Sequence, residues 1–181
     1  VKGAFPHWLN GTTGAIIPFS ANDNGADLVE TSYLMMGLLT ARQYFNAVDV
    51  AETNLRSDIN TLYNNVEWDW FRQGGQNTLY WHYSPDKAWV MNMQIRGWNE
   101  ALVTYIMAAS STTHGIPAAV YTNGWKGGGG FANGNSYYGY QLPLGPAQGG
   151  PLFFEHYTFM GVNPNGLNEG SVNYTTQTKN H

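Results

Sequence analysis

The sequence predicts a mainly α-helical fold with small β-hairpin insertions. Three segments carry this prediction. Residues 52–66 have four apolar side chains separated by 4, 3 and 4 positions, which is helical spacing: Leu55, Ile59, Leu62 and Val66. Residues 26–45 show a similar pattern. Residues 151–160 begin with Pro and are followed directly by Gly161, as is common for helices.

The other elements follow in chain order. Residues 1–25 are rich in turn dipeptides and predict a loop. Two runs, 78–82 and 89–93, flank a turn at residues 84–87 and predict a β-hairpin. Further helices are expected at 98–109 and 116–121, a flexible loop at 127–130 and a short strand at 137–142.

Composition excludes several classes of protein. The 181 residues include no Cys, so a disulfide framework and a cysteine nucleophile are excluded. The net charge of −4 provides no basic surface for nucleic acid. No apolar run approaches the ~20 residues that span a bilayer, so we expect no membrane insertion.

Charged residues make up only 11% of the chain, and aromatic residues make up 15%. The chain also contains 19 Asn. Aromatic rings stack on the C–H faces of sugars, and amides bind hydroxyl groups, so this composition suits a saccharide ligand. An aromatic-rich core explains it equally well.

Three carboxylates, Asp23, Asp27 and Glu30, are separated by 4 and 3 positions near the start of the first predicted helix. Such crowding raises at least one pKa, which is how a site obtains an acid and a base together. An Asp cap followed by a Glu at the third helical position is also an ordinary helix N-terminus. The two roles are compatible.

Glu100 is the second acidic candidate. It follows Trp98 and Asn99 and lies in the first turn of an otherwise apolar predicted helix. This setting suits an acid in a sugar pocket, and it also suits a first-turn Glu that interacts with the helix dipole.

A dense group of aromatic residues surrounds the turn at 73–77 and the predicted hairpin, which favours either stacking platforms or core packing: Trp68, Trp70, Tyr80, Trp81, Tyr83 and Trp89. His82, His114 and His156 lack metal-ligand spacing, so we expect no metal. The glycines at 127–130 lack the context of a nucleotide-binding loop, so we expect no cofactor.

Several strings stand in one order along nearly the whole chain: residues 3–8, 17–20, 25–31, 37–45, 66–70, 79–82, 95–100, 142–145 and 149–154. Together these strings resemble the bacterial glucoamylase-like domain. This group includes the endo-β-1,2-glucanases of glycoside hydrolase family 144 and a domain of cyclic β-1,2-glucan synthases.

The resemblance implies an (α/α)6 toroid with a sugar cleft at one end. Twelve helices with their connections need roughly 200 residues, and this sequence predicts five or six helices. We therefore expect residues 1–181 to be a partial catalytic domain that lacks helices at both ends.

The resemblance also implies roles for individual residues. The acidic cluster of the family corresponds to Asp23, Asp27 and Glu30, and its Gly-Trp-Asn-Glu carboxylate corresponds to Glu100. The implied reaction is inverting hydrolysis of a β-1,2-glucosidic bond, with Glu100 as the acid and the cluster as the base side. The residues expected to bind substrate are Trp81, His82, Arg96, Trp98, Asn99, Tyr137, Phe154 and His156.

Two other functions stay open at this point: a non-catalytic carbohydrate-binding module, and a transglycosylase domain that closes glucan rings. In each case the expected partner is an oligo- or polysaccharide. The absence of Cys and the low charge suit the bacterial periplasm or cell exterior.

Overall fold

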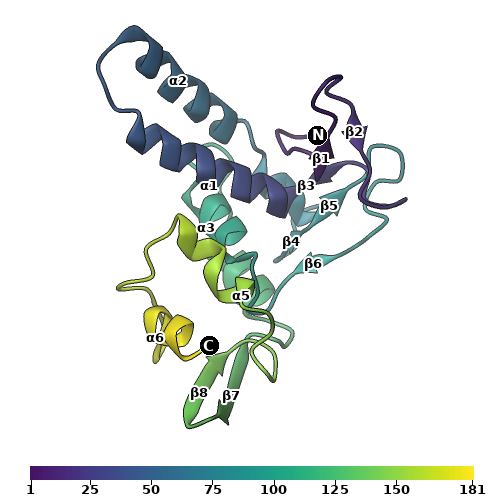
Figure 1. The fold of residues 1–181 in the computed structure, drawn as a ribbon. Coiled ribbons are helices and arrows are strands. Elements are labelled where there is room, and N and C mark those ends of the chain that lie inside the picture. Colours follow the sequence, from purple (N-terminus) through teal and green to yellow (C-terminus); the bar gives the residue numbers. More distant parts are fainter.

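A computed structural model describes residues 1–181. Helices are its main regular structure (Figure 1), with bounds α1 (Leu28–Tyr44), α2 (Val50–Asn64), α3 (Leu102–Ser110), α4 (Ala118–Val120), α5 (Phe153–His156) and α6 (Tyr174–Asn180). Two short 3-10 helices are η1 (Trp68–Arg72) and η3 (Thr158–Met160), and a short π-helix is η2 (Tyr121–Trp125). The expectation of a mainly helical fold with small strand pairs is confirmed.

The strands are short and form five separate antiparallel pairs. Their bounds are β1 (Trp8–Leu9), β2 (Ile16–Ile17), β3 (Ala26–Asp27), β4 (Leu79–Tyr80), β5 (His82–Tyr83), β6 (Gln94–Ile95), β7 (Ala132–Tyr137), β8 (Tyr140–Leu144), β9 (Asn168–Glu169) and β10 (Val172–Asn173). The partners are β1–β2, β3–β5, β4–β6, β7–β8 and β9–β10.

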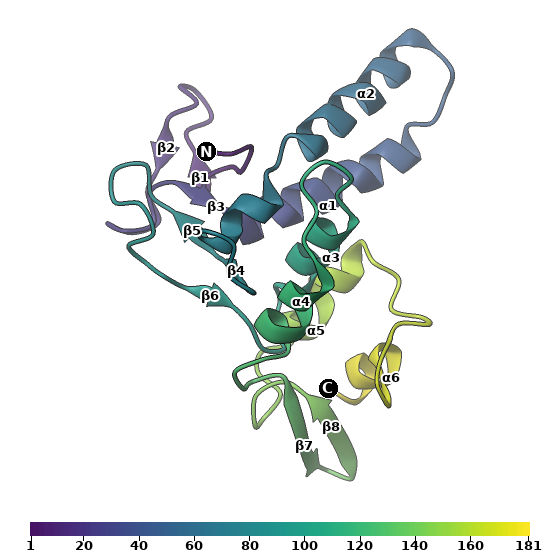
Figure 2. The ribbon, with the colours of Figure 1, turned by 180° about the vertical axis from the view of Figure 1, so that it is seen from behind.

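Helices α1 and α2 form an extended pair at one end of the molecule, and α3 lies against α1 in both views (Figures 1 and 2). A buried hydrogen bond of 2.8 Å between Ser32 Oγ and Thr104 Oγ1 joins α1 to α3. In α2, Ile59 is buried, whereas Leu55 and Leu62 are 37% and 40% exposed. The apolar stripe predicted for this helix is therefore only partly covered.

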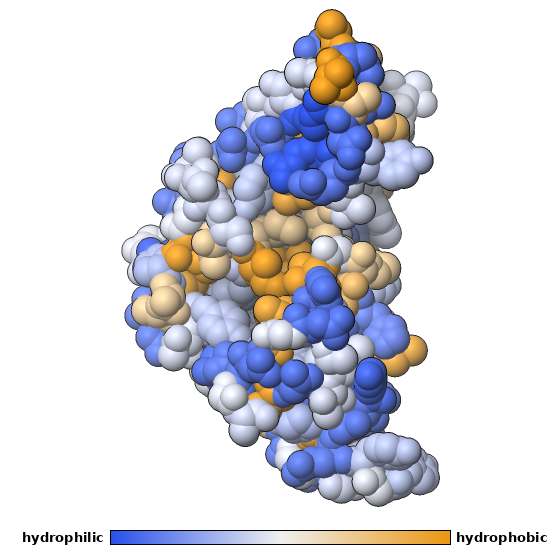
Figure 3. All heavy atoms as spheres, turned by 90° about the vertical axis from the view of Figure 1, so that its left-hand side faces the viewer, coloured by the Kyte–Doolittle hydropathy of each residue, from blue (hydrophilic) through white to orange (hydrophobic).

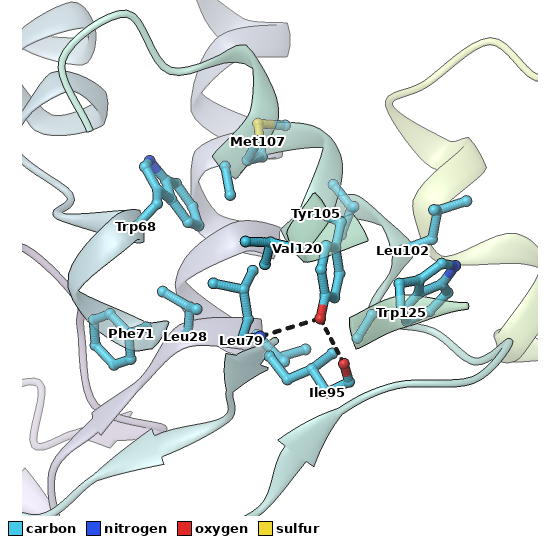
Figure 4. Packing of buried hydrophobic residues seen from close by; sticks show 14 of the residues in the cluster. Leu28, Trp68, Phe71, Leu79, Ile95, Leu102, Tyr105, Met107, Val120 and Trp125 are labelled. Carbon is cyan, nitrogen blue, oxygen red and sulfur yellow. Dashed lines mark hydrogen bonds between the residues drawn. The ribbon is translucent and has the colours of Figure 1, made fainter. Parts of the chain in front are cut away.

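The main core lies where α1, α3 and the β4–β6 pair meet (Figure 4). Tyr105 on α3 lies at its centre. Its hydroxyl accepts a hydrogen bond from Leu79 N at 3.1 Å and donates one to Ile95 O at 2.7 Å. These bonds satisfy backbone groups at the ends of two short strands, and they fix α3 to the strand pair.

The strand segments differ from prediction in detail. Strand β4 pairs with β6, with Leu79 opposite Ile95, so the hairpin exists but its second strand starts after residues 89–93. Trp89 turns away instead to pack against Trp70 and Tyr83, with ring centroids 4.8 and 5.0 Å apart. The single strand expected at 137–142 is instead the hairpin β7–β8.

The helix at 98–109 begins only at Leu102, and the one at 116–121 is divided between α4 and η2. The segment 151–160 is likewise divided, into α5 and η3. The loop expected at 1–25 contains the small β1–β2 pair.

One face of the molecule carries a band of hydrophobic surface, hollowed near its middle (Figure 3). A hollow of about 330 Å³ on the side of α1 is lined by Tyr33, Met36, Gly37, Thr40, Met160 and Gly161. Among the helices, none has the length and apolar character that a membrane crossing requires.

Candidate active site

Asp27 begins helix α1 and joins it to the strand β3. Its Oδ1 accepts hydrogen bonds from the backbone N–H groups of Val29 and Glu30, both at 3.0 Å, so it is the N-cap that the sequence favours. Its Oδ2 accepts a hydrogen bond from Trp81 Nε1 at 3.3 Å and lies 3.1 Å from His7 Nδ1. The side chain is fully buried, and its contacts connect the start of α1 to Trp81 and His7.

Strand pairing places these groups together. Asp27 lies opposite His82 in the β3–β5 pair, and Leu28 N donates to Trp81 O at 2.8 Å. A Cβ at Gly25 would lie 2.3 Å from Tyr83 O, so only glycine allows β3 to approach β5 this closely.

Burial raises the pKa of Asp27 from 3.8 to about 6. The hydrogen bonds from the Glu30 backbone and from His7 lower it, while the negative charges of Glu30 and Asp23 raise it further. Asp27 therefore changes charge near pH 6, above the range of an ordinary aspartate.

His7 extends the cluster toward solvent. Its ring packs against Phe19, with centroids 4.4 Å apart. Asp27 holds the Nδ1 side of this ring, and Nε2 lies 4.0 Å from Glu30 Oε1. The Glu30 side chain is 37% exposed and forms no short hydrogen bond within the chain. Glu30 is thus the carboxylate of the cluster that a substrate can reach most readily.

Asp23 lies behind this group, 7% exposed. Its Oδ1 is 3.4 Å from His82 Nε2 and has no hydrogen-bond partner. His82 Nε2 instead accepts a hydrogen bond from Gly25 N at 3.0 Å. Burial lowers the pKa of His82, and the charge of Asp23 opposes this. A neutral His82 with an unprotonated Nε2 fits both observations.

Ligand atoms of His7, Asp23 and Asp27 lie within 4.8 Å of one another, so these three residues could share a cation. However, both oxygens of Asp27 already face N–H groups or the His7 ring within the chain. The oxygens of Asp27 are therefore satisfied within the chain, whereas Asp23 Oδ1 is not.

Glu100 lies in the turn before α3 and is partly buried. Its carbonyl oxygen accepts hydrogen bonds from Tyr33 Oη at 3.1 Å and from Thr158 Oγ1 at 3.3 Å. Burial raises the pKa of its carboxyl group, and the charge of Glu30 adds to the effect. Burial together with the charges of Glu100 and Glu30 also raises the pKa of Tyr33. Glu30 and Glu100 therefore lie within each other's electrostatic field, with Tyr33 beside both.

The predicted binding residues fall into different environments. Trp81 belongs to the acidic cluster through its bond to Asp27, and His82 lies buried behind it. Trp98, which the resemblance implies binds substrate, is 2% exposed. Its indole fills the core, where it packs against Tyr174 with centroids 4.9 Å apart.

The side chain of Asn99 is used within its own turn, where Oδ1 accepts from Ala101 N at 2.9 Å and Nδ2 donates to Arg96 O at 3.2 Å. Arg96 is partly buried, its guanidinium lies against Gly128, and its Nε has no partner.

The remaining predicted residues lie elsewhere. Tyr137 is on the β7–β8 hairpin, which both ribbon views place away from β3 (Figures 1 and 2). It borders a hollow of about 560 Å³ shared with Tyr138, Tyr140 and His181. Phe154 and His156 are on α5, where His156 is exposed. The structure does not bring these three residues to the acidic cluster.

Most aromatic residues around the turn at 73–77 pack against one another and do not form an open stacking surface. Trp68 is fully buried, and Trp70, Tyr83 and Trp89 contact one another. Within this group, Trp81 is the member that binds a candidate carboxylate.

Sequence reasoning did not single out His7, Tyr33 or Glu155. Tyr33 is three positions after Glu30 on α1, so helical spacing could have identified it. His7 reaches Asp27 across 20 positions, and Glu155 reaches Trp98 across 57. No local pattern signals such contacts.

Residues 92–181 match the Glycoamylase family model, which describes glucoamylase-like proteins. Glu100 lies in the matched part, whereas the cluster at 23–30 lies before it. The chain is also 43% identical over 191 residues to an exo β-1,2-glucooligosaccharide sophorohydrolase (non-reducing end) from Parabacteroides distasonis. That match covers 95% of this chain and 26% of the relative.

Solved structures agree with these matches. An endo-β-1,2-glucanase from Chitinophaga pinensis, in complex with sophorotriose and glucose, is 45% identical with a TM-score of 0.94. A β-1,2-glucanase from Parabacteroides distasonis is 41% identical with a TM-score of 0.95. Each match covers 99% of this chain, but only 44% and 28% of the two solved chains.

The chain thus spans between a quarter and a half of the length of these relatives. Within that span, both fold and sequence agree closely. The resemblance to the bacterial glucoamylase-like domain, and to its β-1,2-glucan-hydrolysing relatives, is therefore confirmed.

Proposed function

We propose that the protein hydrolyses β-1,2-glucan or a related β-glucosidic oligosaccharide with a pair of carboxyl groups. The observation that carries this proposal is the relationship between Glu30 and Glu100. Both are partly exposed, they come from different elements, and the charge of Glu30 acts on the protonation of Glu100. The named activities of the relatives support the substrate class.

Glu100 takes the part of the general acid. Its raised pKa keeps a proton on the carboxyl group to higher pH, so that it can protonate the glycosidic oxygen as the bond breaks. Glu30 takes the part of the base, because it is the most accessible carboxylate of its cluster. It removes a proton from the water that attacks the anomeric carbon. Asp27 and His7 hold the base side in place.

The proposed stereochemical course is inversion. An inverting pair is separated by ~6.5–9.5 Å, which leaves room for the water, whereas retention requires ~5–5.5 Å. We further propose that residues 1–181 are part of an (α/α)6 toroid, which the longer relatives and the helical fold support. The proposed location is the periplasm or cell exterior, supported by the Cys-free, low-charge composition.

The test is hydrolysis of β-1,2-glucan by the full-length protein, followed as new reducing ends. Glu100→Gln and Glu30→Gln should each lose roughly 10²–10⁴ in rate, as is usual when a general acid or base is removed. Glu67→Gln is the matched control, because Glu67 pairs only with Lys2 at the surface. Proton NMR of the first product should show the inverted anomer.

Binding of the glucan without turnover would identify a carbohydrate-binding module instead. Formation of rings without reducing ends would identify a transglycosylase. Full activity in both Gln variants would show that other residues perform the chemistry.

A further inference from the structure

Glu155 on α5 is a buried carboxyl group that the proposed chemistry does not use. It is fully buried. Its Oε1 accepts hydrogen bonds from Trp98 Nε1 at 2.7 Å and from Gln177 Nε2 at 2.9 Å, while Oε2 has no partner. Burial raises the pKa of the carboxyl group, and these two hydrogen bonds oppose that shift. Short hydrogen bonds to a buried carboxyl group hold the side chains of Trp98 and Gln177 in place.

Trp98, which Glu155 binds, comes two positions before Glu100. The backbone between them turns sharply, with Gly97 in the left-handed region at φ +80° and Trp98 N donating to Gly130 O at 2.9 Å. The indole is thus anchored at both its backbone and its ring nitrogen. Because the indole is held in place, the backbone of Asn99 and Glu100 can follow it in fewer directions.

Thr158, three positions after Glu155, binds the same turn. Its Oγ1 donates to Glu100 O at 3.3 Å and accepts from Val103 N at 3.1 Å. Helix α3 starts after Ala101, which offers no side-chain cap. Thr158 therefore supplies, from a distant part of the chain, the oxygen that a helix N-terminus requires.

Residues 155 and 158 are three positions apart and face the same way on consecutive helical turns. One bonds to the side chain before Glu100, and the other bonds to the carbonyl of Glu100 itself. We propose that Glu155 and Thr158 are positioning residues that hold the Glu100 turn in the geometry its carboxyl group needs. This inference rests on the proposed function.

The experiment compares Thr158→Val and Trp98→Phe in the full-length protein. Thr158→Val keeps the shape of the side chain while removing both hydrogen bonds of the Thr158 hydroxyl. Trp98→Phe keeps an aromatic ring but removes the indole N–H that binds Glu155. Because small misplacement of a reacting group is costly, we expect kcat to fall roughly 10- to 100-fold with KM changed little. Thr158→Ser should restore kcat, because it restores the hydroxyl. Thr122→Val, the same change at an exposed threonine, is the control.

A double-mutant cycle separates positioning from a general structural role. In a Glu100→Gln background, Thr158→Val should cause no further loss of rate, because the group it positions is gone. An equal loss in both backgrounds would overturn the proposal. So would an unchanged kcat in Thr158→Val or in Trp98→Phe.

A readout without activity distinguishes failure of this inference from failure of the proposed function. If the wild type hydrolyses no glucan, the proposed function fails. Nitrogen–proton NMR then still tests the contacts: Thr158→Val should shift the backbone N–H signals of Ala101, whose peptide group contains Glu100 O, and of Val103, whereas Thr122→Val should not. Unshifted signals in Thr158→Val would overturn the positioning role.

Discussion

The hydroxyl of Tyr33 donates a hydrogen bond to the carbonyl oxygen of Glu100 across 3.1 Å. Tyr33 is one helical turn after Glu30 on α1, so this contact ties the helix of the proposed base to the turn of the proposed acid. The two carboxyl groups are 70 positions apart in sequence, and this is a direct link between their segments.

Tyr33→Phe tests that link. The ring stays, packed edge-on against Tyr157 with centroids 5.6 Å apart, but the hydrogen bond is lost. The expected cost in unfolding free energy is about 1 kcal/mol, measured by urea denaturation. We also expect a lower kcat, because Glu100 O retains only the bond from Thr158. A kcat equal to that of the wild type would show that Thr158 alone holds the turn.

His7→Asn tests the base side. An Asn side chain can place its amide near the position of Nδ1, and so keep a bond to Asp27, but it cannot reach Glu30 as Nε2 does. We therefore expect the melting temperature to change little and the hydrolysis rate to fall. If His7→Asn destabilises the fold but leaves the rate unchanged, His7 serves packing rather than the arrangement of Glu30.

The stability of the fold should depend on the charge of Asp27. Its pKa is raised from 3.8 to about 6 by burial, so the folded state binds this proton more tightly than the unfolded state does. The stabilisation is complete below pH 3.8 and is lost as pH rises through about 6, with an upper limit of roughly 3 kcal/mol from this group.

Asp27→Asn should remove that pH dependence, because Asn keeps the cap but has no charge to gain. Urea denaturation of both proteins at pH 4, 5, 6 and 7 measures it. Parallel stability curves for the two proteins would contradict the raised pKa.

Chelation should leave activity unchanged. The oxygens of Asp27, the central acid of the group at residues 7, 23 and 27, already face N–H donors and the His7 ring within the chain. The check is the hydrolysis rate after prolonged EDTA treatment and after addition of Zn²⁺, Mn²⁺ or Ca²⁺. A rate that falls with EDTA and returns with one of these ions would assign a metal to this group.

Local patterns in the sequence predicted α1 and α2 well, and the shorter helices less well. Helix α1 follows its apolar spacing and its Asp cap, and the Asp23–Asp27–Glu30 group lies together because its members are close in sequence. Distant contacts could not be predicted in this way. The family resemblance implies that Trp98 binds substrate, but no local pattern indicates that its indole donates to a carboxyl group 57 positions away in the core.

The same reason explains the start of α3. Apolar spacing extends the predicted helix back to residue 98, yet the side chain of Asn99 bonds to its own turn and delays the helix until Leu102. Likewise, His7 joins the site only because β3 pairs with β5 and the chain before it folds back onto Asp27.

The cap on α3 also sets an order of events during synthesis. Val103 N is bonded by a hydroxyl 55 positions further along the chain. A nascent polypeptide on the ribosome cannot complete the start of this helix until Thr158 has left the exit tunnel. The acid side of the proposed pair is therefore assembled late, well after the segment that contains Glu30 has emerged.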